Sequence, residues 1–250
     1  MPASINNPAG ADLSALGWVT PDWPAPACVK AGSSTRQGGV SPPPYDSLNL
    51  GDHVGDEPQN VIQNRQRLAD VRDFPNPPVW LKQVHGVHVV NASHIGNGDP
   101  EADASYTTEA GVVCAAMTAD CLPVLFCDRQ GSVVAAAHAG WRGLADGVLE
   151  ETVAAMKTDT EHLMAWLGPA IGPQAFEVGD EVRATFITHH AAAKQAFTPS
   201  VKGTEGHWMA DIYQLARIRL NTIGINSLTG RLYGSHLIAG KFTASQAYVI

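Results

Sequence analysis

Long hydrophobic runs and clustered basic residues are both missing from this chain of 250 residues. No stretch approaches the roughly 18 consecutive apolar residues that a membrane helix requires, so we expect no membrane partner. Only 16 residues are Lys or Arg, against 24 that are Asp or Glu, and the net charge is −8. Because proteins bind phosphate backbones through clustered basic side chains, this balance argues against a nucleic-acid partner.

Cysteines are also scarce, and no two of them stand in a Cys-x-x-Cys spacing. A chain of this length can form a large core and does not depend on the few disulfides that four cysteines could form, so we expect the cysteines to be reduced. The first basic residue is Lys30, and the cationic start that is typical of a secretory signal does not appear. Together these features favour a cytoplasmic location.

The composition indicates a globular chain, because 44% of the residues are hydrophobic and 16% are charged. These values exclude a disordered chain and a coiled coil rich in ion pairs. We expect one domain over residues 1–250, with residues 1–27 as an extended lead-in and residues 225–250 as a C-terminal tail. Trp18 and Trp23 are the expected anchors of the lead-in.

Hydrophobic spacing predicts strands that interleave with helices. Strands are expected at Val29–Ser34, Val79–Val84, Val87–Val90, Val112–Met117, Leu122–Cys127, Val133–Ala137 and Leu163–Leu167, and helices at 56–71, 144–157, Glu181–His189 and Asp211–Ile223. The run from Val112 to Ala137 has the pattern of a buried antiparallel meander. The interleaving and a locally mixed strand order predict an α/β (mixed α+β) fold.

The hairpin within that meander places a cysteine close to a histidine. If Arg129 and Gln130 are the two central residues of its turn, Cys121 lies directly opposite His138. Directly opposed side chains have Cβ atoms about 4.5–5.5 Å apart, close enough for a thiolate and an imidazole to share one metal ion. The spacing therefore predicts half of a metal site at the open end of the hairpin.

A third ligand has to come from another segment, and His85, at a bend beside Gly86, is the best placed. Two histidines and one cysteine make an open zinc site, in which the fourth position is left for water with a pKa of about 7. Two other interpretations stay open at this point. Cys121 and His138 are either ordinary buried residues or a metal-free pair of nucleophile and base.

Several polar residues near this constellation are candidates for proton transfer or substrate binding. Asp120 precedes Cys121 and is the candidate proton shuttle. Arg142 stands between Gly140 and Gly143 at the start of a helix, where it either holds an anion such as phosphate or pairs with an acid. The remaining substrate-binding candidates are Arg36 as a second anion contact, Ser47 and Asn49 as neutral hydrogen-bonding groups, and Gln83.

Six segments together carry a family resemblance. They are Pro44–Asp56 (PYDSLNLGDHVGD), Lys82–Gly86 (KQVHG), Met117–Val124 (MTADCLPV), His138–Leu144 (HAGWRGL), Trp166–Pro173 (WLGPAIGP) and Phe176–Gly179 (FEVG). In these segments the chain strongly resembles the YfiH-like family, also called the laccase-domain or polyphenol oxidase family. The resemblance covers roughly residues 28 to 224.

That resemblance implies a zinc-dependent purine nucleoside phosphorylase acting on adenosine, inosine, guanosine and methylthioadenosine, with adenosine deaminase activity. The family zinc ligands fall on His85, Cys121 and His138, which the resemblance also makes the catalytic centre. The implied fold is a layered sandwich of mixed β-sheets flanked by helices. For this phosphorolysis, our own hypothesis is that Arg36 and Arg142 orient phosphate.

The chain departs from the family pattern in its tail. The family has an aromatic-Ser-x-Arg-Arg segment followed by a Thr-Gly-Arg turn, whereas Lys241–Gln246 (KFTASQ) occupies that region here without an arginine pair. If that pair helps to hold phosphate or ribose, turnover or affinity is expected to fall.

Three rival functions remain. The oxidase name suggests a copper-dependent polyphenol oxidase, since two His and one Cys also bind copper, but no His-x-His pair of the kind that a multicopper cluster uses occurs. A second rival is a hydrolase that removes a misincorporated amino acid from a nucleotide-linked peptidoglycan precursor. The third is a non-enzymatic binding module with a structural zinc, which requires a fourth protein ligand. We expect small-molecule substrates and either a monomer or a homodimer.

Overall fold

The computed structural model describes residues 16–96, 98–200, 203, 205–230 and 246–250. Its strands are β1 (Trp18–Val19), β2 (Gly32–Ser34), β3 (Val89–Asn91), β4 (Ala104–Thr107), β5 (Ala115–Thr118), β6 (Leu122–Asp128), β7 (Val134–Ala139), β8 (Leu163–Leu167), β9 (Glu177–Gly179), β10 (Phe197–Pro199), β11 (His207–Ala210), β12 (Ser227–Thr229) and β13 (Gln246–Val249). Its α-helices are α1 (Pro58–Arg72), α2 (Trp141–Asp146), α3 (Val148–Met156), α4 (Asp180–His189) and α5 (Ile212–Thr222). Short 3-10 helices are η2 (Ala92–His94), η3 (Thr160–His162) and η4 (Ala191–Ala196).

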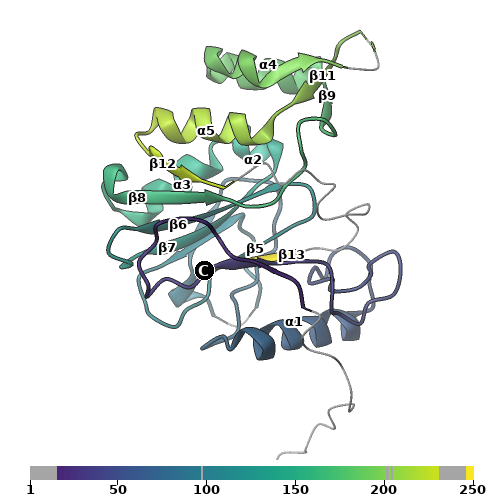
Figure 1. Ribbon diagram of the computed structural model, residues 1–250, viewed down its shortest axis with the longest axis vertical. Helices are drawn as coiled ribbons and strands as arrows, with labels where there is room; N and C mark the ends of the chain where they lie inside the picture. Colours follow the sequence, from purple (N-terminus) through teal and green to yellow (C-terminus); the bar gives the residue numbers. More distant parts are fainter. Residues whose placement is uncertain (1–15, 97, 201–202, 204, 231–245) are drawn as a thin grey trace, which may run out of the picture.

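The described strands form three sheets in a layered arrangement. A six-stranded mixed sheet has the order β12-β8-β6-β7-β4-β3, a four-stranded sheet has the order β1-β2-β13-β5, and β10-β11-β9 form a small third sheet. Helices α2, α3 and α5 cover one side of the six-stranded sheet, and α1 lies beyond the four-stranded sheet on the other side (Figure 1). The predicted layered sandwich of mixed sheets flanked by helices is confirmed.

Strand β6 shows how the sequence builds these layers, because its side chains alternate between two cores. Leu122, Val124 and Phe126 are fully buried in the cluster that includes the helices. Leu125 and Cys127 are fully buried in the cluster shared with β5 and the N-terminal segment. Since both faces are buried, the strand is a continuous apolar run rather than an alternating one.

The helices agree with the expected ranges except in one place. Helix α5 begins after Asp211, whose side chain caps it by accepting a 2.9 Å hydrogen bond from the Gln214 N–H. The helix expected over 144–157 is instead two helices, because Gly147 adopts a φ of 110° between α2 and α3. No helix among the described residues has the length and apolar character needed to cross a membrane.

Two strand predictions are wrong. The expected meander is only a hairpin, since β6 and β7 pair with each other while β5 pairs with β13 in the other sheet. The expected strand at Val79–Val84 is an irregular segment in which Val79 and Lys82 form isolated bridges, to Cys114 and Glu101 respectively. Side-chain hydrogen bonds replace strand pairing there: Gln83 binds the Met117 backbone, and Asp103 accepts from the His85 N–H.

The two ends of the chain are described only in part. Trp18 and Val19, in the expected lead-in, form β1 and pair with β2. Strands β12 and β13 both belong to the expected tail, and β13 inserts between β2 and β5. Residues 1–15 of the lead-in and residues 231–245 of the tail, which hold most of the departing KFTASQ segment, lie outside the described residues.

Candidate metal centre

Cys121 and His138 come together through the β6–β7 hairpin, in a register two residues away from the predicted one. His138 pairs with Pro123, and Leu122 pairs with Ala139. The loop is longer than expected, because the hairpin closes with the Asp128 N–H donating to the Val133 carbonyl. A shift of two residues leaves every side chain on its own face, so the neighbourhood was predicted correctly although the pairing was not.

His85 occupies a left-handed bend with a φ of 62°. Three consecutive backbone N–H groups of this bend donate to one carboxylate, that of Asp103, from Val84 at 3.2 Å, His85 at 2.9 Å and Gly86 at 2.7 Å. A left-handed conformation is uncommon for a residue other than glycine and needs support from its surroundings. Asp103 supplies that support.

The same carboxylate also orients His138. The Nδ1 atom of His138 lies 2.8 Å from Asp103 Oδ1, and the His138 N–H donates to the Asp103 carbonyl at 2.7 Å. Both side chains are almost fully buried. Because a carboxylate accepts only, Nδ1 carries the hydrogen and Nε2 is turned toward the centre.

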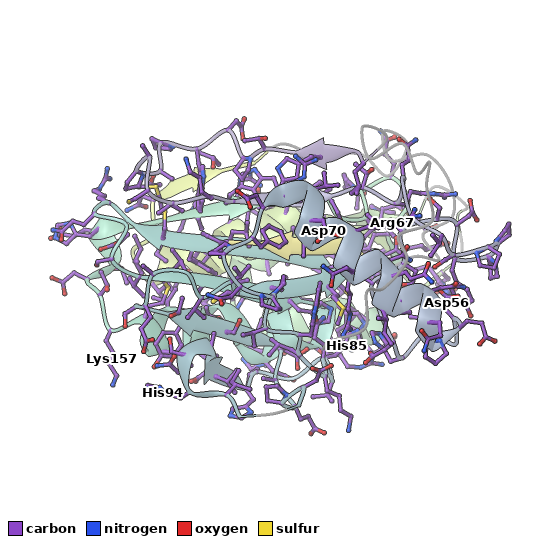
Figure 2. All side chains as sticks on the ribbon, turned by 90° about the horizontal axis from the view of Figure 1, so that it is seen from below. Asp56, Arg67, Asp70, His85, His94 and Lys157 are labelled. Atoms are coloured by element: carbon purple, nitrogen blue, oxygen red, sulfur yellow. The ribbon has the colours of Figure 1, made fainter. Side chains whose placement is uncertain are left out.

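The three candidate ligands converge. One ligand atom each from His85, Cys121 and His138 lies within 4.8 Å of the others. Cys121 Sγ lies 3.8 Å from His85 Nε2, and the two imidazole rings meet edge to face with centroids 4.8 Å apart. His85 is labelled in Figure 2. The structure therefore contains the His-Cys-His group that the sequence predicts.

Electrostatics at the centre favour a thiolate beside an imidazolium when no metal is present. Burial alone would raise the pKa of Cys121, but hydrogen bonds from His138 and His85 outweigh it and lower the pKa to about 6. Burial would lower the pKa of His138, yet its hydrogen bonds to Asp103 and Cys121 raise the pKa to about 9. The pKa of Asp103 is lowered, since hydrogen bonds, led by that of His138, outweigh its burial. A metal cation that replaces the proton on His138 Nε2 would keep a positive charge beside the Cys121 thiolate.

The donor set fits zinc. One thiolate and two imidazoles are ligands that zinc prefers, and a carboxylate bound to the far nitrogen of a histidine ligand is the usual support of such sites. Within the described part of the chain, no further His, Cys, Asp or Glu joins the group. The arrangement therefore matches an open site more closely than a closed structural one.

Two glycines let other elements approach this centre. A Cβ atom on Gly140 would lie 2.7 Å from His85 Cδ2 and 3.1 Å from Cys121 Sγ. A Cβ atom on Gly143 would lie 2.6 Å from the Gly86 carbonyl oxygen. The start of α2 is thus pressed against the His85 bend at a distance that only glycine permits.

Gln83 is bound to the protein backbone. Its amide accepts from the Met117 N–H at 2.7 Å and donates to the Met117 carbonyl at 2.7 Å, as a paired strand would. This contact fastens the His85 segment to β5 of the four-stranded sheet. Substrate binding by Gln83 stays a prediction.

The loop candidates for substrate binding make contacts within the loop itself. Arg36 donates to Asp46 at 2.6 Å, and Ser47 Oγ accepts from the Gly39 N–H at 3.1 Å. Asn49 is fully buried and donates to Asp56 at 3.1 Å. The structure does not bring these three side chains into the group of metal-ligand atoms.

Arg142 and Asp120 are the exposed candidates beside the centre. The Arg142 guanidinium stacks over Trp141, with Cζ 4.6 Å from the ring centroid, and forms no ion pair with any described residue. Asp120 adjoins Cys121, its carbonyl accepts from the Ile171 N–H, and partial burial raises the pKa of its carboxyl. Their roles in phosphate binding and proton transfer stay predictions.

Asp103 is the functional residue that the sequence reasoning missed. The signal was present, because Asp103 stands between Ala102 and Ala104 in a run that the fold buries completely. An acid among small apolar residues is rarely buried without a partner. Its partners are distant in sequence, so the pattern alone did not identify them.

A cavity of about 970 Å³ lies elsewhere in the molecule. Its lining includes Trp18, Trp23, Cys28 and Ile250, and none of the three candidate ligands. The chemistry of the centre is therefore carried by a group near the surface rather than by this cavity.

Known relatives cover most of the chain. A Pseudomonas aeruginosa protein named purine nucleoside phosphorylase is 57% identical over 217 residues, which span 85% of this chain and 86% of the relative. The Escherichia coli strain K12 protein named purine nucleoside phosphorylase YfiH is 55% identical over 212 residues, with the same two shares covered.

Solved structures and a family profile agree with these relatives. A Neisseria meningitidis protein superposes with a TM-score of 0.86 at 45% identity, covering 93% of this chain and 98% of that chain. YlmD from Geobacillus stearothermophilus gives a TM-score of 0.79 at 31% identity, covering 93% and 95%. Residues 30–235 match the profile described as multi-copper polyphenol oxidoreductase laccase. The chain therefore belongs to the YfiH family, the laccase-like family of this profile.

Proposed function

We propose that this chain is a zinc-dependent purine nucleoside phosphorylase with adenosine deaminase activity. Its substrates in this proposal are adenosine, inosine, guanosine and methylthioadenosine. The observation that carries the proposal is the convergence of His85, Cys121 and His138 on one point, in a chain more than half identical to proteins named purine nucleoside phosphorylase. The proposal places the enzyme in the cytoplasm, as a monomer or a homodimer.

His85, Cys121 and His138 would hold the metal in this proposal. Bound there, zinc supplies a Lewis acid that polarises a substrate atom. The Nδ1–H of His138 stays on Asp103, so this ring keeps one orientation whether or not the metal is bound. The Cys121 side chain already favours the thiolate that a ligand must be.

Phosphorolysis requires that a phosphate oxygen bonds to the anomeric carbon while the bond from this carbon to the purine nitrogen breaks. Arg142 is suited to orient phosphate, because its guanidinium is exposed and unpaired among the described residues. Arg36 already forms an ion pair with Asp46, so its positive charge would be shared between Asp46 and phosphate.

The departing purine takes up a proton, and deamination needs protons moved from water to the leaving amine. Asp120 is suited to both tasks, because its raised pKa lets the carboxyl hold a proton closer to neutral pH. In deamination, water adds to the purine carbon that bears the amino group, and ammonia leaves.

Replacing Cys121 tests the proposal. We expect Cys121→Ala to lose both bound zinc and phosphate-dependent cleavage of inosine, because a methyl group cannot bind the metal. Zinc is measured by elemental analysis, and the products with and without phosphate are identified by mass. Cys28→Ala is the matched control, since Cys28 is an exposed free cysteine outside the ligand group. A Cys121→Ala protein that keeps its zinc and cleaves inosine normally contradicts the proposal.

The description of the family profile keeps copper oxidation as a second candidate. A copper-thiolate centre absorbs visible light, and a zinc centre does not. A colourless protein with stoichiometric zinc and no oxidation of a phenol excludes this candidate. Incubation with a nucleotide-linked peptidoglycan precursor tests the editing hydrolase, because release of an amino acid, identified by mass, would indicate that activity instead.

A further inference from the structure

The Asp103 carboxylate joins two segments that are far apart in the chain. It is fully buried, and it follows the irregular segment that precedes β4. Oδ1 lies 2.8 Å from His138 Nδ1 and accepts from the His85 N–H at 2.9 Å. Oδ2 accepts from the Gly86 N–H at 2.7 Å and from the Val84 N–H at 3.2 Å. All four hydrogen-bonding positions of one side chain are therefore used on the segments that carry two metal ligands.

We infer that Asp103 is a positioning residue that sets the zinc affinity of this centre by holding both histidine ligands with one carboxylate. The inference rests on the zinc centre of the proposed function, and it assigns to one residue the geometry of two ligands. Asp103 fixes the orientation of the His138 ring, and it fixes the left-handed backbone from which His85 projects.

An asparagine at this position shows why the carboxylate is needed. It has nearly the same shape, but one of its two terminal atoms is an NH₂ group that donates instead of accepting. Either His138 and the His85 N–H, or the Gly86 and Val84 N–H groups, would then face a donor. Asp103→Asn therefore weakens the support of at least one histidine ligand while the packing stays almost unchanged.

Asp128, in the β6–β7 hairpin that carries His138, provides a matched control. It is also a buried carboxylate that holds a turn, since it accepts from the Ser132 N–H at 2.7 Å and from the Ser132 hydroxyl at 2.6 Å. It lies at the closed end of the hairpin and contacts no candidate metal ligand. A purely structural role of Asp103 would make Asp103→Asn and Asp128→Asn behave alike.

The test compares zinc affinity with thermal stability. Zinc dissociation constants of the folded wild type, Asp103→Asn and Asp128→Asn are measured by competition with a chromophoric chelator, and Tm is measured on the metal-free proteins. We expect the dissociation constant to rise about 10- to 100-fold in Asp103→Asn and to stay within about 3-fold of wild type in Asp128→Asn. Equal affinities in the two variants overturn the inference.

A second measurement needs no variant, so it holds even if Asp103→Asn fails to fold. In metal-free wild type, hydrogen exchange of the His85 and Gly86 amides is expected to be slow, because Asp103 holds them without help from a metal. Fast exchange at both amides overturns the inference. Zinc binding without phosphorolysis would refute the proposed reaction alone, whereas a wild type that takes up no zinc would refute the reaction and the inference together.

Discussion

Gly140→Ala is the substitution whose effect on the metal centre follows most directly from the distances. The new Cβ atom would lie 2.7 Å from His85 Cδ2, so the ring has to retreat by about 0.7 Å to reach an ordinary contact. Cδ2 is bonded to Nε2, so the ligand atom moves with it. Zinc sites hold their ligand distances within about 0.2 Å. We therefore expect the zinc dissociation constant to rise at least 10-fold.

The same substitution should hardly change folding. Gly140 has a φ of −62°, which alanine adopts without strain, and His85 is exposed and has room to turn away. Replacing glycine lowers the conformational entropy of the unfolded chain and so stabilises the fold by about 0.4–1 kcal/mol. Alanine at a helix N-cap destabilises the helix by a similar amount. We expect the free energy of unfolding of the metal-free protein to change by less than about 1 kcal/mol.

Gly86→Ala is the matched control, because it also adjoins His85. Its Cβ atom would lie 3.4 Å from Asp103 Oδ2 and 3.6 Å from Val84 Cγ2, which are ordinary contacts. Zinc affinity is measured by chelator competition, and stability by urea unfolding followed by circular dichroism. Wild-type zinc affinity in Gly140→Ala, or an equal loss in Gly86→Ala, would refute the reasoning.

Two further predictions concern reactivity and phosphate. In the metal-free protein, Cys121 should react with iodoacetamide as a thiolate, and the rate should fall by half as the pH drops through about 6. Cys114 and Cys127 should stay unreactive, because burial raises the pKa of both thiols to about 12. Peptide mapping by mass spectrometry follows each cysteine, and a half-rate near pH 8.5 would contradict the hydrogen-bonded thiolate. Arg142→Ala should raise KM for phosphate at least about 10-fold in the phosphorolysis assay, as the loss of a charged contact implies. Arg129→Ala, which changes an exposed arginine at the closed end of the hairpin, should leave this KM unchanged.

Local signals in the sequence predicted the elements that local interactions determine. Pro58 and the spacing of apolar residues predicted α1, and Asp211 predicted the start of α5, because a proline and a capping side chain act within one turn of the helix. Gly147 was the exception. Its left-handed conformation divides the helical stripe, although the apolar periodicity continues through it.

Contacts between distant segments were harder to predict. The metal-ligand group was found because a strand alternates with a period of two, so the error in register moved Cys121 relative to His138 without changing its face. The pairing of β5 with β13 joins residues more than a hundred positions apart, and no local pattern specifies such a partner. Asp103 was missed for the same reason, since its role depends on contacts with residues on both sides of it in the chain.

The position of β13 also affects how the protein is made. This strand lies between β2 and β5, although it is the last of the described strands to be synthesised. Until residues 246–249 leave the ribosome, β2 and β5 each present unpaired backbone groups, beside the buried side chains of Ala115 and Met117. The nascent chain therefore passes through an interval in which the edges of β2 and β5 are open to pairing with another chain.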